Sequence, residues 1–413
     1  MIVITGASGF IGQQLVEQLK CKSVMPLLLV SRDRAALARQ FPDAEVTDYA
    51  GLATQDLRNA HILHLAARNN DAGGDAAAFA AANVDHLIAT ARTARAAGAA
   101  KFSISCSTHA LNPDPDDLYG LSKRDGAQRL AAMWPAGAVN LYLPAVVGKQ
   151  FQGRLALLNR LPSFCRSVVL GPLRQVKPVI AVDQLVNRVV ELMTDTVSAH
   201  NDHQWAEVYL ADPVPTAGLY AFAKRTIDLS ACAAIALLLG WAMLVIAALV
   251  RLDSKGAAIF AQARVGRNGR VFTCYKFRTM SLGTTQVATH EVSASSITRI
   301  GAVLRRTKLD ELPQIANVFM NQMSLVGPRP CLPVQSELVA LRKRREVLQL
   351  KPGITGLAQI NNVDMSDPAR LAAWDSRYAA YRTLLLDCII LLRTVSGRGA
   401  GDRVRLASNL PND

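Results

Sequence analysis

The feature that most constrains the fold is an uncharged stretch, LSACAAIALLLGWAMLVIAALV, which occupies residues 229–250. A helix rises by roughly 1.5 Å per residue, so this stretch is long enough to cross a hydrocarbon core of roughly 30 Å. Helices buried in soluble proteins are usually shorter and keep a polar edge. We therefore expect a membrane helix over 229–250, with the buried helix of a soluble protein as the alternative.

Positive charge is concentrated in the second half of the chain. Of the net charge of +14, residues 1–218 contribute +1 and residues 219–413 contribute +13. Such a one-sided field indicates a polyanionic partner, which could be a membrane surface, a phosphorylated substrate or nucleic acid. No recognised nucleic-acid-reading motif accompanies the charge, so we expect no nucleic-acid partner. The length of 413 residues predicts two domains, over 1–218 and 219–413.

The first domain opens with a pattern that predicts dinucleotide binding. MIVIT reads as a buried strand, and GASGFIG follows it directly and leads into a helix. Gly6, Gly9 and Gly12 would let the backbone turn sharply, approach a pyrophosphate and pack helix on strand. Further strands over 61–67 and 101–107, with helical segments between them, predict an α/β fold with a Rossmann-like, doubly wound parallel sheet.

The residue after the second predicted strand indicates which dinucleotide is bound. A chain that binds NAD usually carries an acidic residue there, which holds the ribose hydroxyls. This chain has Arg32 instead, and a guanidinium suits a 2′-phosphate. The sequence therefore favours NADP over NAD, which remains possible; a solvated loop arginine is the alternative.

Tyr119 and Lys123 stand four residues apart in a predicted helix, so they share a face. An ammonium beside a phenol favours the phenolate and would lower the tyrosine pKa. The pair could then exchange a proton with a substrate carbonyl or hydroxyl while nicotinamide moves a hydride.

Together with GASGFIG and the HLAA run at 64–67, this pair makes residues 1–217 resemble the extended short-chain dehydrogenase/reductases of the NAD-dependent epimerase/dehydratase family. The resemblance implies that Tyr119 is the acid/base and that Lys123 is its partner and a cofactor anchor. It further implies that Ser107 or Thr108 orients the carbonyl and that Ala66 contacts the cofactor. Only 11 residues separate Ser107 from Tyr119, fewer than this family usually has. A non-catalytic docking or regulatory module therefore stays open.

The stretch TKLDELPQ, residues 307–314, places Asp310 beside Glu311 among basic residues. The basic residues around the pair are Arg305, Arg306, Lys308, Arg329 and Lys351. These cations predict that Asp310 stays ionised at neutral pH. Two such carboxylates can be salt-bridge partners, or one can attack phosphorus while the other holds Mg²⁺.

Three blocks, QARVGRNGRVFTCYKFRTM, LRRTKLDELPQIANVFMNQMSLVGPRP and KPGITGLAQINN, resemble the monotopic phosphoglycosyl transferases of the bacterial sugar transferase family. The resemblance implies a small α/β, mostly helical domain. It also implies that Asp310 attacks the β-phosphate of a UDP-sugar, that Glu311 binds Mg²⁺, and that polyprenol (undecaprenyl) phosphate accepts the phosphosugar. The implied phosphate contacts are Arg305, Lys276, Arg278 and Arg329, with Gln262 and Arg264 shaping the pocket. A membrane-bound interaction protein without chemistry is the rival.

A straight span over 229–250 would separate the two halves, although NADP and UDP-sugars are both cytosolic. The same resemblance implies a re-entrant helix at the cytoplasmic face of the bacterial inner membrane. Its usual Ser-Pro break is missing here, and Gly240 with Trp241 is the one plausible hinge. We expect a fusion in which an NADP-dependent reductase or epimerase domain modifies a UDP-sugar for the transferase. The specific hypothesis is that this domain reduces the 4-keto group of a UDP-4-keto-6-deoxy-N-acetylhexosamine. Oligomeric state is left open.

Overall fold

The computed structural model describes residues 1–22, 25–148, 176–194, 207–212, 218–281 and 297–397. The chain divides into two compact units. The first unit comprises Met1–Arg174 and Pro178–Pro213, and the second comprises Gln175–Lys177 and Val214–Asp413.

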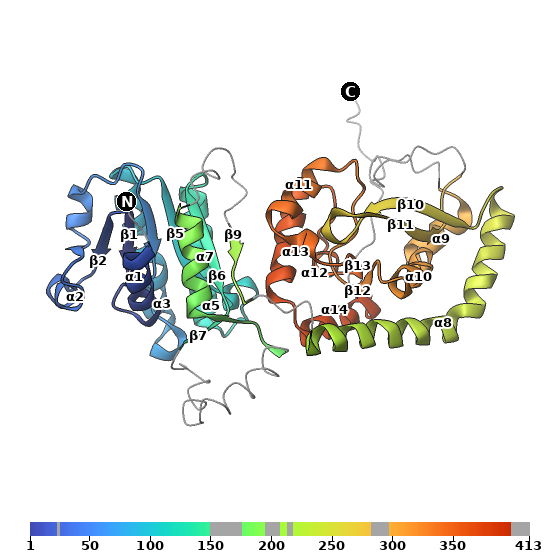
Figure 1. Cartoon of the computed structure of the whole chain (residues 1–413), viewed down its shortest axis with the longest axis horizontal. Helices are drawn as coiled ribbons and strands as arrows, with labels where there is room; N and C mark the ends of the chain where they lie inside the picture. The colour runs from blue at the N-terminus through green and yellow to red at the C-terminus, as the bar shows by residue number, and fades with distance from the viewer. Residues whose placement is uncertain (23–24, 149–175, 195–206, 213–217, 282–296, 398–413) are drawn as a thin grey trace. The chain divides into compact units, whose positions relative to one another are not determined.

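A seven-stranded parallel sheet forms the centre of the first unit, in the order β3-β2-β1-β4-β5-β6-β9 (Figure 1). These strands are β1 (Ile2–Thr5), β2 (Leu27–Val30), β3 (Glu45–Thr47), β4 (His61–His64), β5 (Lys101–Ser107), β6 (Ala138–Leu143) and β9 (Glu207–Tyr209). A separate parallel pair joins β7 (Ala145–Val147) to β8 (Val179–Ala181). Every residue of β1 and β4 is buried, as expected for a sheet that is covered on both faces. The predicted doubly wound sheet is confirmed.

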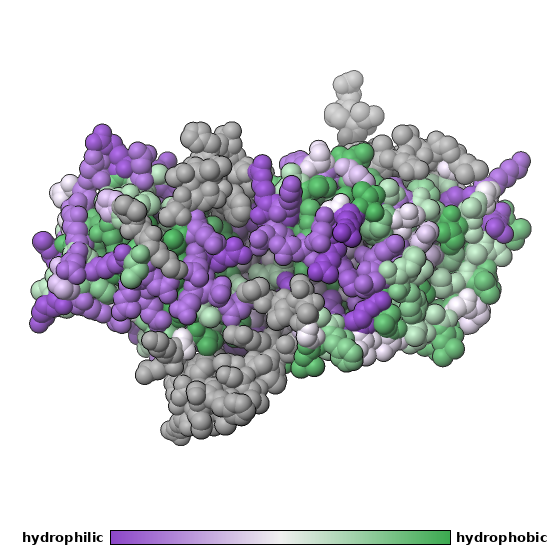
Figure 2. All heavy atoms as spheres, in the orientation of Figure 1, coloured by the Kyte–Doolittle hydropathy of each residue, from purple (hydrophilic) through white to green (hydrophobic). Residues whose placement is uncertain are grey.

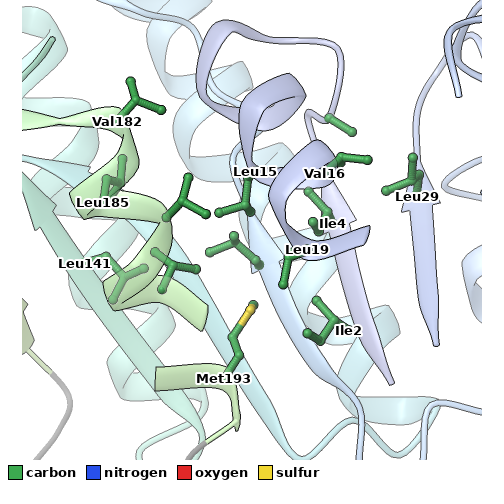
Figure 3. Close-up of a cluster of buried hydrophobic side chains, with 14 of the residues drawn as sticks. Ile2, Ile4, Leu15, Val16, Leu19, Leu29, Leu141, Val182, Leu185 and Met193 are labelled. Carbon is green, nitrogen blue, oxygen red and sulfur yellow. The ribbon is translucent and has the colours of Figure 1, made fainter. Parts of the chain in front are cut away.

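Helices alternate with these strands. They are α1 (Phe10–Lys22), α2 (Arg34–Gln40), α3 (Ala76–Ala80), α4 (His86–Ala96), α5 (Leu118–Met133) and α7 (Val182–Thr194). Apolar side chains of α1 and α7 lie against the strands in one cluster, where Leu15 and Leu19 face Leu185 and Met193 on the same side of the sheet (Figure 3). The order of the strands reverses between β1 and β4, which is where open α/β sheets bind ligands.

Among the described residues, the second unit combines one long helix and several shorter ones with two small sheets. Its helices are α8 (Leu219–Asp253), α9 (Arg299–Thr307), α10 (Gln314–Phe319), α11 (Ser336–Arg344), α12 (Leu357–Ile360), α13 (Pro368–Tyr381) and α14 (Leu384–Val395). An antiparallel hairpin joins β10 (Ile259–Val265) to β11 (Val271–Phe277), and β12 (Ser324–Val326) pairs in parallel with β13 (Gly353–Thr355). This matches the predicted small, mostly helical α/β domain.

Helix α8 contains the apolar stretch and runs without interruption from Leu219 to Asp253. Figure 1 shows that it changes direction partway along its length, so the predicted break takes the form of a bend in a continuous helix. Cys232, in the first part of α8, belongs to one apolar cluster, and Val250, near the end of α8, belongs to another. Met243 contacts both clusters.

The middle of α8 is exposed. Leu237 is 84% exposed and Leu244 is 75% exposed, and hydrophobic residues gather over this region in Figure 2. Within its most apolar window, α8 has a mean hydropathy of 2.7 and is only 11% buried. A core helix of a soluble protein would be mostly buried, so that alternative does not fit. Length, composition and exposure together favour a membrane helix.

Candidate functional site

The dyad of carboxylates lies in a tight turn between two helices of the second unit. Helix α9 ends at Thr307, and Lys308 follows with a left-handed φ of +60°. One turn of 3₁₀-helix, Leu309–Glu311, then leads into α10. Leu309 and Leu312 pack on the apolar cluster around Leu304. The turn is thereby fixed to the core at both ends, and it holds Asp310 and Glu311 between these two anchors.

Glu311 connects the turn to two other elements. Its Oε1 atom accepts hydrogen bonds from Lys276 Nζ at 3.0 Å and from Arg329 Nη2 at 2.9 Å. Lys276 lies on β11, and Arg329 follows β12. These side chains are largely buried, with 14–21% of each exposed, so the pairs are less screened than surface ion pairs. Residues from two of the predicted blocks, carried by three separate elements, therefore meet at one carboxylate.

Asp310 lies within the same charge cluster. Burial is the largest influence on its carboxyl group and raises its pKa to about 6, while the charge of Lys276 opposes this and Glu311 adds to it; Arg305 and Arg329 also lower the pKa. The surrounding cations lower the pKa of Asp310 as predicted, but burial raises it by more. At pH 7 the group is still mainly ionised, and a carboxylate with a raised pKa is a stronger base than an exposed one.

Further predicted residues lie on the same face of the β10–β11 hairpin as Lys276. Paired residues of an antiparallel ladder point to the same side, and Gln262 pairs with Cys274 while Arg264 pairs with Phe272. Lys276 is two residues from Cys274 and so shares their face. Arg264 donates to Gln262 Oε1 at 2.7 Å and to the backbone oxygen of Pro330 at 3.0 Å. Arg264 thus contacts the turn that carries Arg329.

Two predicted phosphate contacts differ in their surroundings. Arg305 lies on α9, donates to Thr279 Oγ1 at 2.9 Å, and acts electrostatically on Asp310. Arg278 donates to Ser254 Oγ at 2.9 Å and to the backbone oxygen of Ser254 at 2.6 Å, at the C-terminal end of α8. A cation at this end of a helix stabilises its last carbonyl groups. The described contacts of Arg278 are therefore with α8, although its buried Nε and Nη1 atoms have no hydrogen-bond partner in the structure.

Sequence reasoning missed a buried ion pair that supports the site. Arg342 of α11 donates through Nε and Nη2 to Asp375 Oδ2 of α13, at 2.9 and 2.7 Å, and both side chains are 3% exposed. Arg342 also donates through Nη1 to the backbone oxygen of Arg329 at 2.8 Å. The residues are 33 positions apart and belong to no short motif, so no sequence signal could pair them.

In the first unit, the predicted phosphate turn has the geometry of a cradle. Gly6 has a left-handed φ of +74°, and a Cβ atom there would lie 2.6 Å from the backbone nitrogen of Ala66. A Cβ atom at Gly12 would lie 2.4 Å from the backbone oxygen of Gly6. The backbone nitrogen of Gly9 donates to the same oxygen at 3.1 Å. Glycine at positions 6 and 12 permits the tight turn and the close packing of helix on strand that this class of cofactor site requires, so the residues fit a dinucleotide.

Tyr119 lies at the start of α5 and forms a side-chain hydrogen bond with Ser107, at the end of β5. Burial raises the pKa of Tyr119 to about 12, and the Ser107 bond only partly offsets this. Lys123 is buried, which lowers its pKa, and its Nζ donates to the backbone oxygen of Ser105 at 2.9 Å. The structure thus brings Tyr119 and Ser107 together, while Lys123 bonds to the backbone of β5, and the tyrosine pKa moves in the direction opposite to the prediction.

The loop after β4 is held by Asn83, which lies in one turn of π-helix, Ala81–Asp85. Its amide accepts from the backbone nitrogen of Arg68 at 2.8 Å and donates to Ser122 Oγ at 3.0 Å. Arg32 follows β2 as predicted, is exposed, and acts electrostatically on Tyr49 and His86. Asn83, Ser122 and Arg32 thus come from three parts of the chain beside the switch point of the sheet: the π-helical turn, α5 and the loop after β2.

Two family models match this chain. Residues 219–398 match the bacterial sugar transferase family, and residues 2–201 match the NAD dependent epimerase/dehydratase family. Both family resemblances that the sequence predicted are therefore confirmed.

Several curated relatives match part of this chain. The exopolysaccharide production protein ExoY of Rhizobium meliloti is 34% identical over 190 residues, which cover 42% of this chain and 84% of that protein. The undecaprenyl-phosphate glucose phosphotransferase of Komagataeibacter xylinus is 36% identical over 185 residues, which cover 42% of this chain and only 35% of the relative. Among solved structures, the Bordetella bronchiseptica enzyme WbmG in complex with NAD is 19% identical, with a TM-score of 0.37, over 51% of this chain and 72% of that one.

Proposed function

The chain belongs to the bacterial sugar transferase family through residues 219–398, and on this premise we propose that its second half transfers a phosphosugar from a UDP-sugar to polyprenol phosphate. The observation that carries the proposal is the ionised dyad beside Lys276 and Arg329. A buried carboxylate next to cations that can receive phosphate oxygens is the arrangement that nucleophilic attack on phosphorus needs.

The proposed reaction has two steps. An oxygen of Asp310 bonds to the β-phosphorus of the UDP-sugar, and the bond to the α-phosphate oxygen breaks, so that UMP leaves. An oxygen of polyprenol phosphate then attacks the phosphorus of the aspartyl phosphosugar, which releases Asp310 and forms a polyprenol diphosphosugar. The covalent intermediate splits one displacement between two bulky substrates into two smaller steps.

Mg²⁺ would supply charge neutralisation on the transferred group. Among the described residues no cluster of three or more His, Cys, Asp or Glu side chains could hold a metal ion alone. Glu311 would hold the ion as a single protein ligand, which is usual for Mg²⁺ beside phosphates. In this arrangement Lys276 and Arg329 would turn from Glu311 toward the phosphates.

The raised pKa of Asp310 predicts an acid limit to the reaction. The nucleophile must be ionised, so kcat/KM for UMP release should rise by about tenfold per pH unit below pH 6, reach half its maximum near pH 6, and level off above pH 7. Initial UMP release by the full chain in lipid, measured between pH 4.5 and 8, checks this. A half-maximum near pH 4 would contradict the argument from burial.

For the first half we propose an NADP-dependent reductase that acts on the keto group of a UDP-sugar. The phosphate cradle supports the dinucleotide, and Arg32 supports a 2′-phosphate. When bound, the cofactor would supply the hydride. A tyrosine with a pKa of about 12 is protonated at neutral pH, so Tyr119 is suited to donate its proton to the carbonyl oxygen that receives the hydride.

Replacing the acid should stop reduction without preventing cofactor binding. With Tyr119→Phe we expect NADPH consumption in the presence of a UDP-4-keto-6-deoxy-N-acetylhexosamine to fall by about 10²- to 10⁴-fold, because the proton donor is lost. Tyr209→Phe, on the edge strand β9, which is separated from β5 by β6, serves as the matched control. If the unaltered chain binds NADPH and consumes none with keto sugars, the docking-module alternative is favoured instead.

We further propose that α8 enters and leaves the cytoplasmic leaflet of a bacterial inner membrane without crossing it. The bend in α8 and the exposure of Leu237 and Leu244 support this arrangement. Tags at both termini should then be accessible to protease from the same side. Opposite accessibility would indicate a spanning helix.

A further inference from the structure

The first turns of α8 carry charged residues, although the rest of the helix is apolar. Lys224, Arg225 and Asp228 precede the uncharged stretch, and from sequence alone the two cations could be read as residues that face the membrane surface. In the structure Asp228 is 5% exposed and the Lys224 side chain is 19% exposed. They point into the domain. We refer to Lys224, Arg225 and Asp228 as the clamp.

Arg225 holds the end of α10. Its Nη1 donates to the backbone oxygen of Val318 at 2.8 Å, and its Nη2 donates to that of Phe319 at 3.2 Å. The last carbonyl groups of a helix have no partners within the helix, and a cation there is favourable. Helix α10 begins three residues after Glu311, so Arg225 fixes the element into which the catalytic turn runs.

The other two residues of the clamp hold β12. Lys224 Nζ donates to the backbone oxygen of Val326 at 3.1 Å and to Asp387 Oδ2 at 2.7 Å. Asp228 accepts from the backbone nitrogen of Leu325 at 3.0 Å and from Ser324 Oγ at 2.8 Å. All three residues of β12 are therefore bonded to α8, and Arg329 follows only three residues after β12.

A second path leads from α10 to Lys276. Asn317, which is fully buried in α10, donates to the backbone oxygen of Thr273 at 2.7 Å and accepts from the backbone nitrogen of Tyr275 at 3.1 Å. Both of these residues lie on β11, next to Lys276. The clamp thus reaches, through α10 and through β12, the two cations that bond to Glu311.

We propose that the clamp positions the site: it couples the placement of α8 in the membrane to the geometry of Glu311, Lys276 and Arg329. The proposal rests on the transferase function stated above. A reacting group displaced by about 1 Å can lose about 10²-fold in rate. Because α8 is both the membrane element and the anchor of α10 and β12, a shift of α8 in the bilayer would be transmitted to the catalytic turn.

Single substitutions in the full chain test this, assayed in vesicles. Arg225→Met removes both bonds to α10, and Lys224→Met removes the bonds to β12 and Asp387. Lys224→Arg and Arg225→Lys keep the charge. Arg267→Met is the matched control, because Arg267 Nε donates to the backbone oxygen of Gln349 at 2.9 Å in the same domain but makes none of the described bonds to α10 or β12.

Three readouts are combined with vesicle flotation and melting temperature. The first two are kcat and KM for UMP release. The third is the labelling rate of Cys274 by a thiol reagent, followed by peptide mass spectrometry; Cys274 is 1% exposed and lies between the two β11 residues that Asn317 bonds. The reagent reaches Cys274 only when β11 opens locally. The labelling rate therefore reports how firmly β11 is packed, independently of UMP release.

If the clamp positions the site, both Met variants lower kcat by about tenfold or more per folded molecule, and KM changes by less than about threefold. Arg225→Met also raises the labelling rate of Cys274, flotation is unchanged, and the charge-keeping variants recover most of the activity. Wild-type kcat and labelling in the Met variants, or an equal loss in Arg267→Met, would overturn the proposal. If the unaltered chain releases no UMP from any UDP-sugar, the transferase function fails, and the labelling rate alone decides whether the clamp holds β11.

Discussion

Asp310→Asn is expected to abolish UMP release and to leave the protein folded and bound to membranes. The amide cannot form the bond to phosphorus, and losing a covalent nucleophile typically costs several orders of magnitude in rate, about 10⁴-fold or more. The substitution changes neither the size of the side chain nor the bonds between Glu311, Lys276 and Arg329. Incubation with a UDP-sugar labelled in the sugar, without polyprenol phosphate, should give a labelled protein only when Asp310 is present.

A matched control is available in the same domain. Asp364 is exposed, and its described bonds are to Ser366, so Asp364→Asn changes the charge equally without touching the dyad. Normal UMP release by Asp310→Asn, or a labelled phosphosugar on a different residue, would show that Asp310 is not the nucleophile. The interaction-protein rival predicts no UMP release from the unaltered chain.

The buried pair of Arg342 and Asp375 predicts the largest effect on stability. In Asp375→Ala the guanidinium of Arg342 remains buried without its carboxylate, so we expect the free energy of unfolding to fall by about 3–5 kcal/mol. The measurement is denaturant unfolding in detergent, followed by a probe in the second unit. UMP release should fall as well, because Arg342 also bonds to the backbone oxygen of Arg329.

The double variant Arg342→Met with Asp375→Leu separates these two effects. Apolar side chains of similar volume can replace a buried ion pair at little cost, so stability should return to within about 1–2 kcal/mol of the unaltered chain. UMP release should stay low, because the Arg329 backbone has lost a donor. An unfolding free energy for Asp375→Ala within about 1 kcal/mol of the unaltered chain would contradict the burial of the pair.

Features set by neighbouring residues were predictable from sequence. The turn at Gly6 to Gly12 depends on a strand, a glycine pattern and a helix in direct succession, and the structure contains all three. The prediction that Lys276, Arg329 and Glu311 share one site came from the resemblance of long sequence blocks to a known family. No local pattern would have placed these residues together.

Features set by burial were not predictable in the same way. The sequence lists the cations around Asp310, but only the fold shows that desolvation of its carboxyl group outweighs them. The same holds for Tyr119, for which a neighbouring lysine predicted a lower pKa and burial produced a higher one. Likewise, Arg278 resembles a phosphate ligand in the sequence, whereas its described bonds reach the end of α8.

Under the proposed function, the exposed leucines at the middle of α8 would also determine how this protein meets its lipid acceptor. A chain held at an interface by Leu237 and Leu244 searches for its acceptor by diffusion in two dimensions. Its turnover should therefore follow the mole fraction of polyprenol phosphate in the surface, and adding inert lipid at constant bulk acceptor concentration should slow the reaction.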